Sequence, residues 1–588
     1  ILYNKLKITL FMSTARKNLP QRLLYHTVSQ DYSLYTNIDQ AVWRYIMKIS
    51  YPFFKDNAHE KYVDGLDLMG ISINKIPLVD DMDKKLDNYS WGAVAVKGFI
   101  PPIVFMEFLS KKVLPIAVDM RTHHHINYTP APDIVHESSG HAPIIADPDY
   151  AEYLSAYGEI SRYAIESKYD SELYELIREM SDIKENPNSK IEDLKKIEKR
   201  FEQMNKENVW LSEAAELARM NWWTIEYGLV GDLKNPKIYG AGLLSSVSES
   251  NDCLKSKVKK IPISIDCIKT GYNITEPQPQ LFVTKNFKEL KQILYEYKKT
   301  MAYINGGENG LNKAILSKNI TTSVYDSGLQ VSGILDKFIK DNNDKITYLQ
   351  FVGNVQLSNN EIQIKGHGTD KHPNGYGGAL GLLSDIGLPL HQLNSKQLKQ
   401  IGLIKNTNVK LKFDGGLIIE GRVKNIHKIN NSPILVSLDQ CEVRLNNKQL
   451  YKPEWGTYDL SCGNKIISVF GGPADWNKFY NYTPSLEKSI HQSSNLNADT
   501  IDLNILYGKV KTLKMDNADN DNYIPILEKL YTNYPNDWLL CMEIYEKIYN
   551  DNLLKNEVKH LRAHINKFSE NELIADTIRR GLDLIEKN

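Results

Sequence analysis

The sequence predicts a multidomain protein in which a mainly α-helical domain is followed by a β-rich domain and a helical C-terminal region. Its 588 residues are too many for a single hydrophobic core of ordinary size. Apolar residues recur at helical spacing up to about residue 310, and short alternating segments replace them from about residue 320. Helical spacing returns from about residue 484. We therefore expect a partly disordered extension at 1–24, a helical domain at 25–315, a β-rich domain at 320–478 and helices at 484–588.

The helices of the first domain are expected from their caps and apolar spacing. Asp39 precedes a segment with apolar residues at 42, 45, 46 and 49, so we expect it to be an N-cap. Residues 103–114 predict a second helix, entered through two prolines. The stretch 170–208 is rich in Glu and Lys and predicts a solvated helical hairpin. A further helix is expected over 212–227, stopped by Gly228.

The β-rich domain is expected from alternating segments punctuated by Gly, Asn and Asp. These segments are KITYLQFVGNVQL, VKLKFDGGLIIEGRV, PILVSLDQCEVRL and NKIISVF. Alternation of apolar and polar residues is typical of half-buried antiparallel strands, so a small barrel or sandwich is predicted.

The composition narrows the class of protein. Basic and acidic residues number 72 each, which removes the main argument for a nucleic-acid partner. No apolar run approaches the ~20 residues that cross a bilayer, so no membrane span is expected. Five scattered cysteines indicate neither a disulfide framework nor a zinc cluster, and a cytoplasmic location is expected. Residues 1–11 precede Met12, and their apolar part is shorter than the ~7–15 residues of a signal peptide's core.

A candidate metal site consists of His136, His141 and Glu226. Two imidazoles and one carboxylate can hold one face of a ferrous ion and leave open positions where O₂ is activated. The histidines are five residues apart, unlike the four of the zinc-protease motif HExxH. On a regular helix they would lie about 140° apart, so the helix must be distorted or must end, which Gly140 permits.

Ordinary structural roles for these residues stay open at this point. An isolated pair of histidines at this spacing is more often part of a core or a surface. Glu226 follows two tryptophans and is expected to be buried, where a carboxylate needs a cation or a metal as partner. Arg219, about two helical turns earlier, is an alternative partner.

Other histidines and a glycine pair are weaker candidates. His123, His124 and His125 predict a solvated loop rather than a metal site. His367 and His372 lie in a Gly-rich loop of the β-rich domain, where ligation of a metal is the less favoured interpretation. YGAGLL lacks the third glycine and the surrounding βαβ unit of a dinucleotide site.

Several separated motifs together resemble one family. They are DYSLYTNIDQAVWRYIM, RTHHHINYTPAPDIVHESSGHAPIIADPDYAEY, NWWTIEYGL, KIYGAGLLSSVSES and NITEPQPQLFV. In this order they resemble the pterin-dependent aromatic amino acid hydroxylases, from about Asp31 to Phe287, and are most similar to long bacterial members of the phenylalanine 4-monooxygenase type. The region beyond about 320 has no counterpart in the animal enzymes.

The resemblance implies a role for each matched residue. The implied iron ligands are His136, His141 and Glu226. The implied substrate site comprises Arg121, which grips the carboxylate, together with Asp133, Thr129, Pro130, Gly242 and Ser245. The implied pterin site comprises Gly98, Phe99, Ile100, Phe105 and Glu137. Catalytic contributions are implied for Glu137, Ser245 and Trp222. Without the family, Phe105 would be read as core packing.

The resemblance also implies a reaction. It is hydroxylation of the ring of L-phenylalanine with O₂ and a tetrahydropterin, of the tetrahydrobiopterin kind, at a non-haem Fe(II). Tryptophan or tyrosine as substrate, and a metal-dependent hydrolase with the same ligands, are the alternatives. Asn221 departs from the tyrosine of many members, and Ser138 and Ser139 replace a bulkier pair.

The C-terminal half is expected to be a binding or assembly module and to support homo-oligomer formation.

Overall fold

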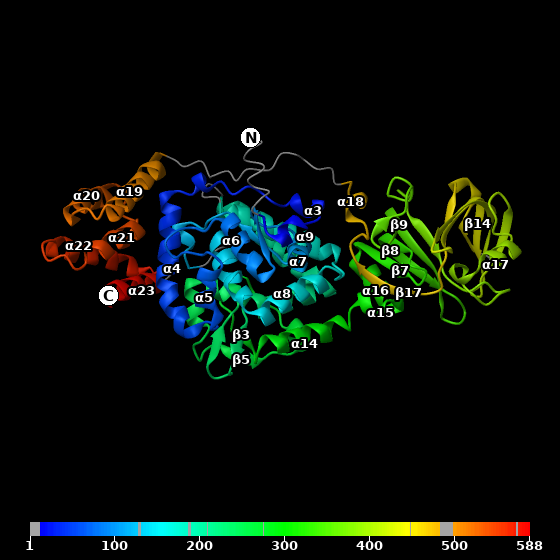
Figure 1. Ribbon diagram of the computed structural model, residues 1–588, viewed down its shortest axis with the longest axis horizontal. Helices are drawn as coiled ribbons and strands as arrows, with labels where there is room; N and C mark the ends of the chain where they lie inside the picture. The colour runs from blue at the N-terminus through cyan, green and yellow to red at the C-terminus, as the bar shows by residue number, and fades with distance from the viewer. Residues whose placement is uncertain are drawn as a thin grey trace.

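The structure is a computed structural model that describes residues 12–127, 131–185, 190–207, 210–274, 276–446, 448–481, 498–571 and 574–587. Three parts lie in a row, with a largely helical body between a β-rich part and a bundle of C-terminal helices (Figure 1). The segments 1–11 and 128–130 lie outside the described residues, and with them Thr129 and Pro130. Within the predicted N-terminal extension, residues 14–17 and 21–24 form helices, and the Ser13 amide donates to the buried carboxylate of Asp83 (3.0 Å).

The central body combines helices with two small sheets. The helices that frame it are α2 (Thr14–Lys17), α3 (Gln21–Leu24), α4 (Asn37–Asn57), α5 (Lys61–Leu68), α6 (Val79–Leu86), α7 (Pro102–Ser110), α8 (Pro148–Ser161), α9 (Lys168–Glu185), α10 (Ile191–Glu207), α11 (Glu213–Asn221), α12 (Ala241–Ser245), α13 (Val247–Asp252), α14 (Phe287–Lys298), α15 (Ala302–Asn305) and α16 (Gly307–Ser317). One sheet pairs β1 (Gly92–Val96) in parallel with β2 (Val113–Ala117). The other has the order β4 (Pro236–Ile238), β3 (Leu229–Gly231), β6 (Gln280–Thr284), β5 (Lys259–Pro262).

Two of the expected helix boundaries are wrong. Helix α4 is capped by Thr36, whose hydroxyl accepts from the Asp39 amide (3.1 Å), while the Asp39 carboxylate accepts from the Thr36 amide (2.8 Å). Asp39 is therefore the third residue of a capping box and not the cap. Helix α7 ends at Ser110, and the apolar residues after it form strand β2, so the expected helix over 103–114 is too long.

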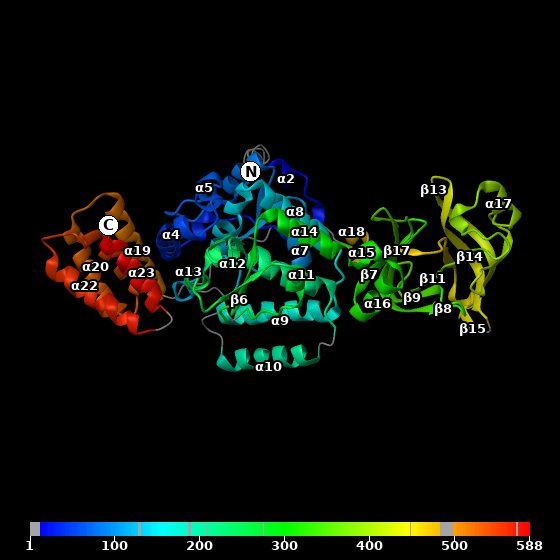
Figure 2. The same cartoon turned by 90° about the horizontal axis from the view of Figure 1, so that it is seen from below.

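The charged stretch forms the expected helical hairpin. Helices α9 and α10 pack through a small apolar core of their own, and α10 lies on the outer side of α9, away from the body (Figure 2). Tyr174 on α9 donates through its hydroxyl to the carbonyl of Phe99 (3.2 Å). The hairpin thus contacts the segment that the motifs assign to pterin.

The β-rich part consists of two antiparallel sheets. One has the order β10 (Ile362–Gln363), β9 (Ile346–Asn359), β8 (Gln330–Lys340), β7 (Ile320–Tyr325), β17 (Ile466–Gly471), with β11 (Tyr376–Ala379) also on β9. The other has the order β12 (Asn408–Lys412), β13 (Leu417–Ile429), β14 (Ser432–Leu445), β15 (Lys448–Tyr451), with β16 (Tyr458–Ser461) also on β14. The short helices α17 (Ser395–Gln400) and α18 (Trp476–Phe479) accompany them. Every alternating segment named from the sequence is a strand or a pair of strands here.

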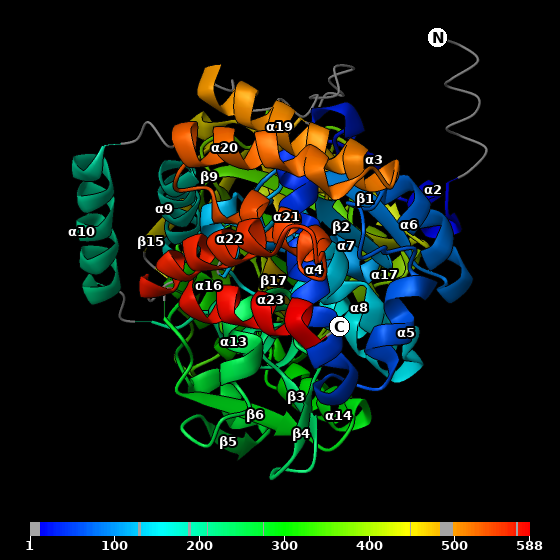
Figure 3. The same cartoon turned by 90° about the vertical axis from the view of Figure 1, so that its left-hand side faces the viewer.

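The C-terminal helices pack against the body of the same chain. They are α19 (Ala498–Met515), α20 (Ile524–Asn533), α21 (Trp538–Ile548), α22 (Lys555–Lys567) and α23 (Ala575–Lys587). They cover α4 (Figure 3), where Arg44 pairs with Glu543 (2.7 Å) and Lys48 with Glu546 (2.6 Å). Their buried apolar residues join the core of the body. An oligomer through this region stays a prediction.

Two expectations from composition can be compared with the structure. No helix in the described ranges is long and apolar enough to cross a membrane. All five cysteines are buried and unpaired.

Candidate active site

The two histidines of the first candidate site lie on a π-helix, η4 (Val135–His141). Hydrogen bonds from residue i to residue i+5 bring residues five apart onto one face, so His136 and His141 point the same way. The expected distortion is confirmed, but the helix does not end at Gly140. A Cβ on Gly140 would lie 2.7 Å from the carbonyl oxygen of Ala241, so this glycine permits the close approach of α12.

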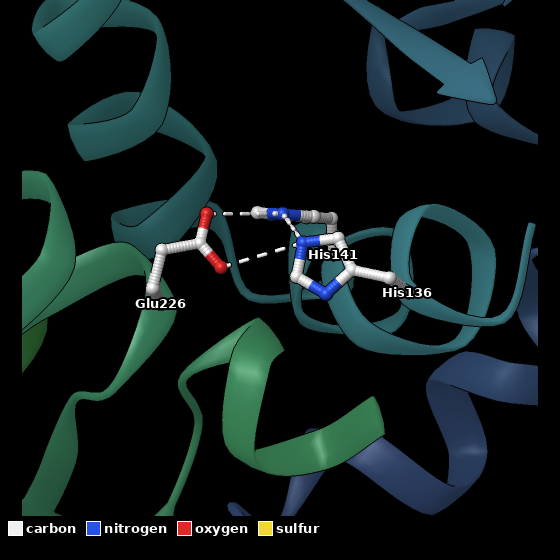
Figure 4. A group of neighbouring side chains, drawn as sticks. All are labelled: His136, His141 and Glu226. Atoms are coloured by element: carbon white, nitrogen blue, oxygen red, sulfur yellow. Dashed lines mark hydrogen bonds and ion pairs between the residues drawn. The ribbon is translucent and has the colours of Figure 1, made fainter. Parts of the chain in front are cut away.

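Glu226 reaches the same point from a second π-helix, η6 (Trp222–Glu226). Its Oε2 lies 3.4 Å from Nε2 of His136, and its Oε1 lies 3.4 Å from Nε2 of His141. The two Nε2 atoms are 3.2 Å apart (Figure 4). Three ligand-type atoms therefore face one small volume. Arg219, the alternative partner, instead donates to the backbone carbonyl of Ile268 (3.2 Å).

Ser245 sets the tautomer of His136. Its hydroxyl lies 3.0 Å from Nδ1 of His136 and donates its proton to the carbonyl of Ala241 (2.8 Å). Because a hydroxyl has one proton, Ser245 accepts from His136, and Nδ1 carries the hydrogen. The lone pair is thereby placed on Nε2, the atom that faces Glu226.

The charges of the three groups depend on one another. Burial, the dominant effect, lowers the pKa of His136 to about 4, so this imidazole is neutral. The pKa of Glu226 is held at about 2, because attraction to His141 and His136 outweighs burial. The pKa of His141 is raised, since the carboxylate of Glu226 outweighs the opposing effect of burial. A partly buried carboxylate facing two imidazoles is a donor set suited to a divalent cation.

A buried ion pair lies beside this group. The side chain of Arg121 is 1% exposed and binds Asp133 through Nε (2.7 Å) and Nη2 (2.8 Å). Its Nη1 donates to the carbonyl of Ser245 (3.0 Å). These hydrogen bonds to described residues use three of the five N–H groups of the guanidinium. Two N–H groups remain as donors. Asp133 also accepts from the His136 amide (3.0 Å), so the arginine and the π-helix share one anchor.

Glu137 is buried behind the histidines. Its Oε2 has no hydrogen-bond partner within the described part of the chain and lies 4.0 Å from Nε2 of His141. Burial is the largest effect on this carboxyl and raises its pKa to about 8. An unpartnered carboxyl oxygen in this position can accept or donate a hydrogen bond to a bound molecule.

Three aromatic rings stack beside Glu226. The indole of Trp222 lies between Tyr227 (4.5 Å between ring centroids) and Tyr272 (4.3 Å). Sequence reasoning named Trp222 but neither tyrosine. Tyr227 follows Glu226 directly and could have been suspected, whereas Tyr272 comes from a distant loop. Asn221, which departs from the tyrosine of many family members, hydrogen-bonds Glu226 through its side chain.

The other described residues of the predicted site have the following local contacts. Gly98 has a φ of +55° and donates its amide to Asp119 (2.9 Å), a conformation that favours glycine. Phe105 on α7 presents its ring 6.3 Å from that of His141. Ile100 packs against the apolar cluster around β1 and β2. A Cβ on Gly242 would lie 2.9 Å from the ring of Tyr227, so α12 fits closely over the site.

Comparison with known proteins identifies the body. Residues 25–188 and 210–305 match the family model described as biopterin-dependent aromatic amino acid hydroxylase. This part of the chain belongs to that family. The protein is accordingly a pterin- and iron-dependent monooxygenase, as the motifs predicted.

Individual relatives cover the same region. The phenylalanine-4-hydroxylase of Mesorhizobium japonicum is 28% identical over 269 residues, which cover 45% of this chain and 81% of that protein. The phenylalanine-4-hydroxylase of Chromobacterium violaceum is 28% identical over 283 residues, covering 47% and 80%. A crystal structure of the Chromobacterium enzyme with iron(III) and 7,8-dihydrobiopterin is 26% identical, with a TM-score of 0.37, covering 47% and 85%.

Proposed function

We propose that the protein hydroxylates the aromatic ring of L-phenylalanine, with O₂ and a tetrahydropterin, at ferrous iron held by His136, His141 and Glu226. The observation that carries this proposal is the convergence of the three ligand atoms, 3.2 to 3.4 Å apart, next to a buried arginine with two spare donors. When bound, the iron and the pterin supply the electrons and the open coordination positions with which O₂ is activated.

The residues present fit an iron ion. Two imidazole nitrogens and a carboxylate would hold a ferrous ion from one side and would leave its other positions to small molecules. Ser245 holds the ring of His136 in the tautomer that a metal needs. Glu226 is kept ionised, which supplies the negative charge that a divalent cation requires.

Arg121 is proposed to bind the carboxylate of the amino acid. Its two spare N–H groups form a planar fork that fits a carboxylate, and Asp133 holds the guanidinium in place from the other side. The substrate ring would then lie along the Trp222 stack, whose apolar surface excludes water from the reacting positions.

Glu137 and the segment around Gly98 are proposed to hold the pterin. The orphaned carboxyl oxygen of Glu137 can hydrogen-bond a ring nitrogen or move a proton to or from it. Phe105 offers a ring face for stacking. Gly98, Phe99 and Ile100 would edge the pterin with backbone groups.

Phenylalanine is favoured over tryptophan and tyrosine because relatives named phenylalanine-4-hydroxylase match at 25–28% identity. The decisive assay is anaerobic iron loading followed by aerobic turnover with tetrahydrobiopterin and each of the three amino acids. Tyrosine formation from phenylalanine, stoichiometric with pterin oxidation, is expected. A preference for tryptophan or tyrosine would reject the substrate, and activity with zinc alone would revive the hydrolase alternative.

Glu226→Ala provides the test of the metal ligands. This variant is expected to retain no iron after gel filtration, because two imidazoles alone bind ferrous iron weakly. Glu216→Gln is the control, since Glu216 accepts from Tyr297 (2.7 Å) away from the histidines. Full iron occupancy in Glu226→Ala would remove the proposed role of Glu226. A cytoplasmic location is proposed on the five unpaired thiols.

A further inference from the structure

A second group of metal-ligand residues lies in the β-rich part, outside the matched family region. Among the described residues, only two groups of His, Cys, Asp or Glu bring three ligand atoms within 4.8 Å of one another. One is the site above, and the other is His367, His372 and Asp459. The sequence favoured a Gly-rich loop without a metal at His367 and His372, and the fold brings an aspartate from a distant strand to both.

The spacing of these atoms suits a common ion. Nδ1 of His367 and Nε2 of His372 are 3.4 Å apart, and each lies 3.7 Å from Oδ2 of Asp459. Ligand atoms about 2.1 Å from a tetrahedral zinc ion are separated by about 3.4 Å. The two contacts to Asp459 are too long for hydrogen bonds, and all three separations are close to those that a shared ion gives.

Asp459 presents an unsatisfied oxygen to the two histidines. The residue is 3% exposed, and its Oδ1 accepts from the Ser437 hydroxyl (2.5 Å). Its Oδ2 is buried and has no hydrogen-bond partner in the described ranges. A buried carboxylate oxygen without a donor costs free energy, and a cation would remove that cost.

The two histidines are buried, and their backbones are fixed. The loop between β10 and β11 is tied to β9, because Leu357 donates to the His367 carbonyl and Val355 to the His372 carbonyl, both at 2.9 Å. The histidines are 5% and 8% exposed.

His427 on β13 completes the arrangement from behind. Its Nε2 lies 3.1 Å from Nε2 of His367 and 2.9 Å from Nδ2 of Asn425. When His367 donates through Nε2, its lone pair is on Nδ1, the atom that faces His372 and Asp459. His427 is only partly buried, so solvent approaches the group on this side and gives an ion a route inward.

We propose that the β-rich part binds one divalent transition-metal ion through Nδ1 of His367, Nε2 of His372 and Oδ2 of Asp459. Imidazole and carboxylate ligands at this spacing fit Zn²⁺, with the fourth position left to water. The histidines belong to the loop on the sheet of β9, and Asp459 belongs to the sheet of β14. The ion therefore cross-links the two sheets.

The test is the zinc stoichiometry of the full chain after removal of metals with a chelator, measured by calorimetric titration with Zn²⁺ alone. The double variant His136→Ala/Glu226→Ala, which leaves the β-rich part intact, is expected to bind one equivalent of Zn²⁺ and to melt at a higher temperature with Zn²⁺. Absence of zinc binding in this variant would overturn the proposal, whether or not the hydroxylase assignment holds.

Substitutions in the second group then locate the ion. Adding Asp459→Asn or His372→Gln to the double variant is expected to weaken zinc binding at least 100-fold and to abolish the rise in melting temperature. His391→Gln, which alters a histidine of the same part outside the group, is expected to leave both unchanged. Zinc affinity unchanged by Asp459→Asn, or weakened equally by His391→Gln, would refute the assigned ligands.

Discussion

Substitution of Ser245 by alanine tests whether the hydroxyl behind His136 controls iron affinity. The change removes the only described acceptor of the Nδ1 hydrogen of His136, and leaves the backbone carbonyl that accepts from Arg121. His136 then either buries an unsatisfied N–H or moves the hydrogen to Nε2, where it blocks the metal. Either outcome penalises the iron-bound state.

The size of the effect follows from this contact. Leaving a buried donor unsatisfied costs about 1–3 kcal/mol, and loss of a hydrogen bond to a ligating histidine weakens metal binding about 10–100-fold. The side chain of His136 is 18% exposed, so water offsets part of the cost. We expect the dissociation constant of Fe(II) to rise about 10-fold to 30-fold.

The assay is an anaerobic competition titration of Fe(II) against a chromophoric chelator. Ser250→Ala is the matched control, because this buried serine donates to Val247 (3.3 Å) and serves a neighbouring helix instead of a histidine. At saturating iron the KM for the amino acid should change less than twofold, since Arg121 keeps its partners. Iron affinity within twofold of the wild type, or an equal loss in Ser250→Ala, would refute the reasoning.

Three further changes have defined outcomes. Arg121→Lys keeps the positive charge but loses the planar pair of N–H donors, so the KM for the amino acid should rise about 10–100-fold in steady-state assays. Arg444→Lys at the surface should leave the KM unchanged. An unchanged KM in Arg121→Lys would exclude the carboxylate contact. Gly140→Ala places a Cβ 2.7 Å from the carbonyl oxygen of Ala241 and should destabilise the body by about 1–3 kcal/mol in denaturant unfolding. Gly271→Ala, whose Cβ meets nothing within 4 Å, should leave the free energy of unfolding unchanged. Equal stabilities of the two variants would contradict the close approach of α12. Burial raises the pKa of Asp537 from 3.8 to about 6, so the folded state keeps a proton that the unfolded state releases, and stability should fall by up to about 3 kcal/mol as the pH rises from 4 to 6. Asp537→Asn should reduce that slope, and a slope identical to that of the wild type would show that Asp537 titrates normally.

The grouping of His136, His141 and Glu226 was predictable from the sequence, but the backbone that orients these residues was not. Two histidines and a distant glutamate are recognisable by type and by the motifs around them. The π-helices that orient them were not predictable, because apolar spacing reports which face is buried and not which amide bonds which carbonyl. The five-residue spacing indicated only that a regular α-helix would not place the two histidines on one face.

The errors in the fold have local physical causes. The segment from Val113 to Ala117 continues an apolar helical run, and apolar runs of this length do not distinguish helix from strand. Pro115 is tolerated there because β1 and β2 form a sheet of two strands, in which every strand is an edge. The strands of the β-rich part were easier to predict, because strands such as β12 bury every second residue. This period of two is visible in the sequence as alternating apolar and polar residues.

The two histidine pairs show what such a spacing means. His136 and His141 share a face because a π-helix has the matching period, whereas the equally spaced His367 and His372 meet because two amides of β9 hold their carbonyls in a loop. In each case the carboxylate comes from far along the chain, and packing decides whether it arrives. The five-residue spacing therefore suggests a pair of ligands, and a carboxylate brought to that pair by packing completes each group. Asp459 adds a buried oxygen without a hydrogen-bond partner among the described residues, so zinc stoichiometry tests the β-rich part directly.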